Sequence, residues 1–160
     1  MSSVQDLRHR FVTADTVYGI ILFSALVAVV SDHDSEPLEV LLVSVFSLLV
    51  FWLAHVYAGT IAGHGREVRM GLAFRNAVRH SSGMLYAAVL PAVPLVLGVF
   101  RVLGEDAAVD LCLLVVTVIL GLLGFLSFAE RGHRIPMRIV GALSAALFGV
   151  LIIVLNTAVH

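Results

Sequence analysis

Five apolar stretches, each about 20 residues long, constrain the fold of this chain more than any other feature. They cover residues 11–30, 38–60, 83–100, 107–128 and 136–159, and short polar segments separate them. A helix rises about 1.5 Å per residue, so a stretch of this length crosses the roughly 30 Å hydrocarbon core of a bilayer. The sequence therefore predicts an all-α fold, a single bundle of five transmembrane helices that occupies residues 1–160.

The composition also indicates an integral membrane protein. Hydrophobic residues make up 60% of the chain and charged residues 13%, against roughly 45–50% and about 25% in soluble proteins. Every basic residue other than histidine is arginine, and Ala, Val, Leu and Gly are abundant. This bias is typical of GC-rich bacterial genomes, so we expect a multi-pass protein of a bacterial cell (inner) membrane.

Arginine placement predicts the orientation in the membrane. Nine of the ten arginines fall in the N-terminal segment and in the connections that follow the second and fourth stretches: Arg8, Arg10, Arg66, Arg69, Arg75, Arg79, Arg131, Arg134 and Arg138. The other two connections contain only Arg101. Because short cytoplasmic loops are enriched in Lys and Arg, we expect a cytoplasmic N-terminus and an external C-terminus at His160.

The basic connection over residues 66–80 has two interpretations. Its arginines, Arg66, Arg69, Arg75 and Arg79, could lie on the inner membrane surface, where each attracts anionic lipid by about 1 kcal/mol. Alternatively, they act only as the topological signal. The following stretch contains Pro91 and Pro94, which lack backbone donors and should interrupt and kink the third helix.

Small and polar residues predict which helix faces make contacts, because apolarity alone does not drive helices together in lipid. On the second stretch one such stripe contains Ser44, Ser47, Phe51, His55, Ala58 and Ala62. On the fourth and fifth stretches a helix-packing seam contains Gly121, Gly124, Gly141, Ala145 and Gly149. These faces line either the interior of the bundle or a contact between subunits of a homo-oligomer.

Ionisable residues within the apolar stretches form the candidate functional site. Asp15 and His55 are expected at similar depth, roughly 9 Å and 7 Å from the middles of their helices toward the cytoplasm. A lone charge there costs on the order of 3 kcal/mol, and pairing the two would offset much of that cost. Tyr18, one turn after Asp15, could extend an ion or proton network. Alternatively, His55 bonds a serine or a backbone carbonyl and only fixes the helix register.

Other kinds of site have little support in the sequence. The chain contains no HExxH pattern, phosphate loop, nucleophile elbow or nucleic-acid-binding module, and it has a single cysteine, Cys112. We therefore expect no catalytic residues, metal, cofactor or nucleic-acid partner. Since His80 falls in the basic connection, we also expect no second histidine within the membrane at the depth of His55.

Three short runs resemble the endolysosomal potassium channels and their bacterial relatives. The runs are Asp15-Thr16-Val17-Tyr18-Gly19-Ile20, Phe51-Trp52-Leu53-Ala54-His55 and Leu90-Pro91. In that family the first helix carries Arg-x-x-x-Phe-Ser-Asp, the second ends in Trp-x-x-His and the third has a proline. The resemblance implies that Asp15 and His55 join an inter-helix network and that Ile20 lies near the pore.

The chain departs from the channel pattern at several points. Ala14 precedes Asp15 where the family has Phe-Ser, Arg10 stands five residues before Asp15 rather than six, and the chain has five apolar stretches instead of six. The run around His55 also resembles small actinobacterial integral membrane proteins, which implies no particular activity.

Two functions therefore compete. The first is an oligomeric pathway for potassium ions or protons that uses Asp15, Tyr18 and His55. The second is a non-transporting scaffold or partner subunit that associates through the small-residue seam on the last two helices.

Overall fold

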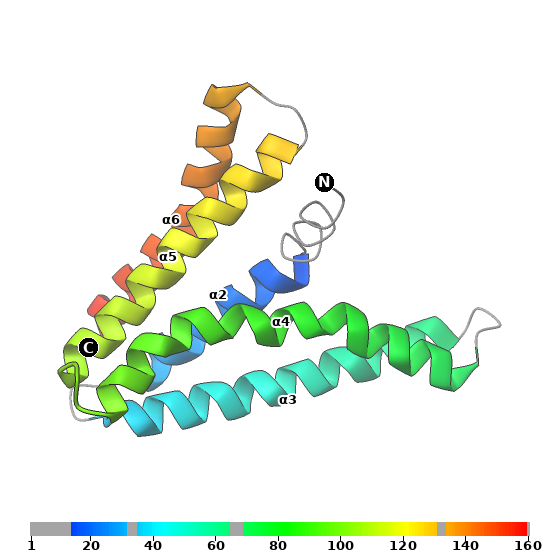
Figure 1. The fold of residues 1–160 in the computed structure, drawn as a ribbon, viewed down its shortest axis with the longest axis horizontal. Helices are drawn as coiled ribbons and strands as arrows, with labels where there is room; N and C mark the ends of the chain where they lie inside the picture. The colour runs from blue at the N-terminus through cyan, green and yellow to red at the C-terminus, as the bar shows by residue number, and fades with distance from the viewer. Residues whose placement is uncertain (1–13, 32–34, 65–68, 131–133, 160) are drawn as a thin grey trace.

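The computed structural model describes residues 14–31, 35–64, 69–130 and 134–159, and its regular elements are all helices (Figure 1). They are α2 (Ala14–Val30), α3 (Pro37–His64), α4 (Met70–Val99), α5 (Glu105–Glu130) and α6 (Ile135–Val159). Helices α3 to α6 are long and apolar enough to cross a membrane, and α2 is a shorter apolar helix of 17 residues. The all-α fold is therefore confirmed for the described residues, and the apolar helices are consistent with a membrane protein. The number of spans and the orientation of the termini stay predictions.

Local chemistry explains several of the helix ends. Pro37 begins α3 at a position where its missing N–H costs no hydrogen bond. Glu105 and Asp106 place negative charge in the first turn of α5, where it stabilises the helix dipole. Arg101 adopts a φ of 57° just after α4, and the Val102 N–H donates to the Leu97 carbonyl at 3.0 Å. This left-handed residue ends α4 and turns the chain toward α5.

Helix α4 begins at Met70 rather than near residue 83, so the connection predicted over residues 66–80 is wrong where the structure describes it. Arg66 lies outside the described residues. With 30 residues, α4 is about 45 Å long, some 15 Å more than a hydrocarbon core. The added length packs on α3, where Gly63 faces Ala73 and Gly59 faces Ala77. Hydropathy locates the membrane part of a helix and misses such a polar extension.

Two prolines lie within α4 without interrupting it. The helix continues from Met70 to Val99 through Pro91 and Pro94, and both proline side chains are buried. One continuous helix therefore accommodates both prolines, and the kink at these positions stays a prediction. Neighbouring helices cover this part of α4, which is how proline is tolerated inside membrane helices.

The inward face of α3 also differs from the predicted stripe. Its buried positions are Pro37, Val40, Ser44, Leu48, Val56 and Thr60, whereas Phe51, His55, Ala58 and Ala62 are exposed. The stripe is therefore rotated by about one residue, and of its members only Ser44 is buried. Because α3 is apolar on all sides, its pattern could not fix the rotation. The partner helix fixes it through close contact at Gly59 and Gly63.

The predicted small-residue seam lies between α5 and α6 of the same chain. A methyl group added at Gly124 would collide with the Gly141 carbonyl and with the Ala145 side chain. One added at Gly149 would collide with Thr117. The two backbones thus approach so closely that only glycine fits, as in other small-residue packing of membrane helices.

The helices form two hairpins with α2 between them (Figure 1). Helices α3 and α4 make one hairpin, α5 and α6 make the other, and both diverge from a common end. At that end Asn156 on α6 donates from Nδ2 to the Ala28 carbonyl and to Ser31 Oγ, each at 3.0 Å. Because the hairpins diverge, the start of α2 has different surroundings on its two sides.

Candidate functional site

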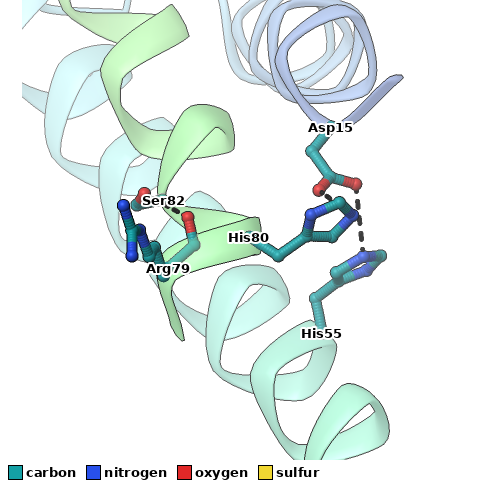
Figure 2. A network of polar contacts seen from close by, with 5 residues as sticks. All are labelled: Asp15, His55, Arg79, His80 and Ser82. Carbon is teal, nitrogen blue, oxygen red and sulfur yellow. Dashed lines mark hydrogen bonds and ion pairs between the residues drawn. The ribbon is translucent and has the colours of Figure 1, made fainter. Parts of the chain in front are cut away.

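Three helices bring Asp15, His55 and His80 together (Figure 2). Asp15 lies in the first turn of α2, His55 on α3 and His80 on α4. Asp15 Oδ1 lies 3.5 Å from His55 Nε2, and Asp15 Oδ2 lies 3.3 Å from His80 Nε2. The structure thus places the two sequence-predicted partners in contact and adds a second imidazole.

His80 was not predicted as a site residue, and the expectation of no second histidine at the depth of His55 is wrong, because both imidazoles contact Asp15. The residue was assigned to a connection because its surroundings are polar. A usable signal was nonetheless present, since small or buried residues recur at helical spacing through that segment: Ala73, Ala77, Ser81, Met84 and Ala88. This spacing predicts that the helix is continuous through His80, which places that residue on a helix rather than in a connection.

Burial is graded across the three side chains. The Asp15 side chain is 13% exposed, that of His55 is 46% exposed and that of His80 is 78% exposed. The carboxylate is therefore shielded while both imidazoles reach outward from it. Asp15 lies in the first described turn of α2. Asp15 Oδ2 makes no hydrogen bond within the described chain, and its contact with His80 is an ion pair only when that imidazole is protonated.

Tyr18 extends the group, as the spacing of one helical turn from Asp15 predicts. Its ring centroid lies 6.3 Å from that of His55, and the two ring planes are tilted by 31°. This separation lies within the range of direct aromatic contact, about 4.5–7 Å. We refer to Asp15, Tyr18, His55 and His80 as the Asp15 cluster.

A cleft of about 710 Å³ lies on the other side of α2, between that helix and the α5–α6 hairpin. Its lining residues are Ala14, Val17, Tyr18, Ile21, Leu120, Leu123, Gly124, Ser127, Phe128, Gly141, Ser144, Ala145 and Phe148. The wall is mostly apolar, and Tyr18 belongs both to this wall and to the Asp15 cluster. We refer to it as the α2–α5–α6 cleft.

The described residues contain no group of three or more His, Cys, Asp or Glu side chains arranged to hold a metal ion. The Asp15 cluster is consistent with this finding, because its imidazole nitrogens face separate oxygens of one carboxylate. Within it, a carboxylate and two imidazoles can exchange protons, and a tyrosine hydroxyl can donate or accept a hydrogen bond.

Three of the four arginines predicted to bind anionic lipid are exposed near the start of α4. They are Arg69, Arg75 and Arg79, all at the end of the α3–α4 hairpin that extends past the Asp15 cluster. Met70, Leu72 and Phe74 are exposed beside them. Lipid binding at this end of the hairpin stays a prediction.

Comparisons with protein-family models, curated proteins and solved structures find no match to this chain. The resemblance to potassium channels over the first three helices therefore stays a prediction. The geometry of the Asp15 cluster is the basis for a functional proposal.

Proposed function

We propose that this chain is a membrane protein that moves protons and that the Asp15 cluster is its proton-binding site. The observation that carries the proposal is the contact of one shielded carboxylate with two imidazoles from two other helices. Ionisable groups within membrane helices are costly, so they commonly mark ion pathways and proton relays. Histidine is suited to this role because it gains and loses a proton near neutral pH.

Protons fit the cluster better than potassium ions do. A potassium site replaces the hydration shell of the ion with several oxygen ligands, usually rings of backbone carbonyls. The Asp15 cluster offers one carboxylate and one phenol, together with imidazole nitrogens that serve protons better than potassium. Potassium transport, which the channel resemblance implies, is the alternative. The experiment below distinguishes potassium flux from proton flux.

The proposal includes five spans in a bacterial cell membrane with the N-terminus in the cytoplasm. In that orientation the exposed arginines at the start of α4 lie in the cytoplasm, as the enrichment of arginine in inner loops requires. His80 is the most exposed member of the cluster and comes directly after Arg79. It would exchange protons with cytoplasmic water and pass them to Asp15.

Two further polar atoms lie on α3 between His55 and the start of the helix, which the predicted orientation places at the external surface. Trp52 Nε1 and Ser44 Oγ are buried and make no hydrogen bond within the described chain. Such groups each cost about 1–3 kcal/mol, so their retention calls for a functional reason. They would contact water that carries a proton onward, while buried Leu48 lies between them on α3 and would close the route in this conformation.

A scaffold function would need a surface other than the predicted seam. The close glycine contacts of α5 and α6 are made within the chain, so they are not available to a separate protein. This observation favours the transport proposal over the scaffold alternative. Assembly into a homo-oligomer is compatible with either function.

Purified protein in liposomes would test the proposal. An internal pH dye reports proton entry when an inward proton gradient is imposed, and a parallel potassium gradient at constant pH tests the alternative. We expect proton entry above that of empty liposomes and no potassium flux. Asp15→Asn should abolish the proton flux, because it removes the only carboxylate of the cluster, and His80→Gln should reduce it at least tenfold.

Two matched variants control for the change in chemistry. Asp110→Asn makes the same substitution at an exposed site on α5, and Tyr57→Phe removes a hydroxyl from an exposed tyrosine on α3 that lies outside the Asp15 cluster. Both should conduct as the wild type does. Proton flux no greater than in empty liposomes, or an Asp15→Asn variant equal to wild type, would exclude the proposed function.

A further inference from the structure

The α2–α5–α6 cleft has the dimensions and the lining of a small-molecule site. Its volume of about 710 Å³ falls in the range of ligand-binding pockets, about 300–1,000 Å³. Glycine at Gly124 and Gly141 leaves the wall formed by α5 and α6 without side chains at those points. Apolar residues supply most of the rest of the wall, so the cleft suits a molecule with an apolar body.

Aromatic residues give the cleft a preference for positive charge. Tyr18, Phe128 and Phe148 all line it. The face of an aromatic ring carries negative electrostatic potential, and it attracts ammonium and related cations within about 6 Å of its centroid. In a membrane this attraction is stronger than at an aqueous surface, because the cation has lost part of its hydration shell.

Asp15, beside the cleft, has the matching charge. Asp15 is next to Ala14 and one turn from Tyr18, both of which line the cleft. The histidines at Asp15 are uncharged when deprotonated, so the cluster then has the single negative charge of the carboxylate. Among the residues that the structure describes, no arginine lines the cleft.

We propose that the α2–α5–α6 cleft binds an amphipathic monocation, with its apolar body against α5 and α6 and its charge near Tyr18 and Asp15. The occupant is a lipophilic amine, ammonium or phosphonium compound. A neutral molecule of the same shape gains none of the electrostatic attraction, and an anion is repelled by Asp15. Binding at equilibrium requires no proton gradient, so this inference stands apart from proton transport.

Equilibrium binding of tetraphenylphosphonium to the full chain in lipid nanodiscs would test the proposal. Tetraphenylborate is the matched probe, because it has nearly the same shape and the opposite charge. Binding to protein-free nanodiscs is subtracted for each ion. We expect saturable binding of one phosphonium per chain and no saturable binding of the borate.

Two variants test separately whether binding depends on the charge of Asp15 and on the free volume of the cleft. Asp15→Asn should weaken phosphonium binding at least tenfold. Ser144→Leu should weaken phosphonium binding similarly, because the larger side chain fills the cleft. Among the described residues the Ser144 hydroxyl donates only to the Gly141 carbonyl of the same helix, at 3.0 Å. The control Ala54→Leu adds the same bulk to an exposed site on α3, away from the cleft, and should bind as wild type does.

Three results would overturn the proposal: no saturable phosphonium binding, equal saturable binding of both ions, or wild-type affinity in Ser144→Leu. If Asp15→Asn does not fold, the Ser144→Leu and Ala54→Leu pair still decides the question. If the wild-type protein conducts protons and does not bind phosphonium, the cleft proposal is wrong and the transport proposal stands. If it binds phosphonium and does not conduct protons, the transport proposal is wrong and the cleft proposal stands.

Discussion

The close crossing of α2 and α4 at Gly19 holds the Asp15 cluster in place, and it provides the sharpest test of the structure. A Cβ atom at Gly19 would lie 2.5 Å from the Met84 carbonyl oxygen and 2.8 Å from Met84 Cα. Both are backbone atoms, so no change of side-chain rotamer relieves the crowding. Gly19→Ala must therefore push α2 away from α4.

The distances give the size of this displacement. Non-bonded heavy atoms are comfortable at about 3.5 Å, so the two helices must separate by about 1 Å at the crossing. Asp15 and His80 each lie four residues before the crossing, one on each helix. Their contact of 3.3 Å would lengthen to about 4.3 Å and cease to be an ion pair. Overpacking of this kind costs about 1–3 kcal/mol.

Thermal unfolding in detergent micelles measures the effect. For a chain of this size about 1 kcal/mol corresponds to about 2–4 °C, so we expect the Tm of Gly19→Ala to fall by about 2–12 °C. Gly71→Ala is the matched control, because a Cβ there meets nothing within 4 Å. That change should raise stability by up to about 1 kcal/mol. A Gly19→Ala variant as stable as Gly71→Ala would refute the close crossing.

Three further predictions concern other parts of the fold. Asn156→Leu removes the bond from α6 to the Ala28 carbonyl and should lower stability by about 0.5–1.5 kcal/mol in the same unfolding assay. Cys112 is fully buried, so it should resist maleimide in the folded protein and react after unfolding in SDS. In intact cells a membrane-impermeant maleimide should label Gly104→Cys and leave Gly71→Cys unlabelled, since the predicted orientation places them on opposite sides. Labelling of only Gly71→Cys would reverse that orientation.

Hydropathy predicted the helices well where a helix end and a membrane surface coincide. The predicted ends near residues 30, 38, 100, 107, 128 and 136 agree with the structure within about two residues, because proline, acidic residues or a tight turn stop the helix there. The start of α4 differs by 13 residues, from 83 to 70. There the helix continues as a more polar segment that packs on α3 through Gly59 and Gly63.

Glycine was a better guide to packing than apolar residues were. The seam on α5 and α6 was predicted because a glycine in a helix marks a place where another backbone comes close. The stripe predicted on α3 does not line the interior of this bundle, because lipid-facing and buried positions of a membrane helix are equally apolar, and its alternative as a contact between subunits stays a prediction. The Asp15–His55 contact could be anticipated from depth alone, but His80 required knowing that α4 starts at Met70.

Helix α2 connects the two proposed sites because its first turns have a different neighbour on each side. Asp15 faces α3 and α4 through His55 and His80, whereas Ala14 and Val17 face the cleft. Tyr18 contacts both regions. At the opposite end of α2, Asn156 bonds the helix to α6. A movement of α5 and α6 about that end would therefore change the cleft most, and it would reach the Asp15 cluster through Tyr18 and the first turn of α2.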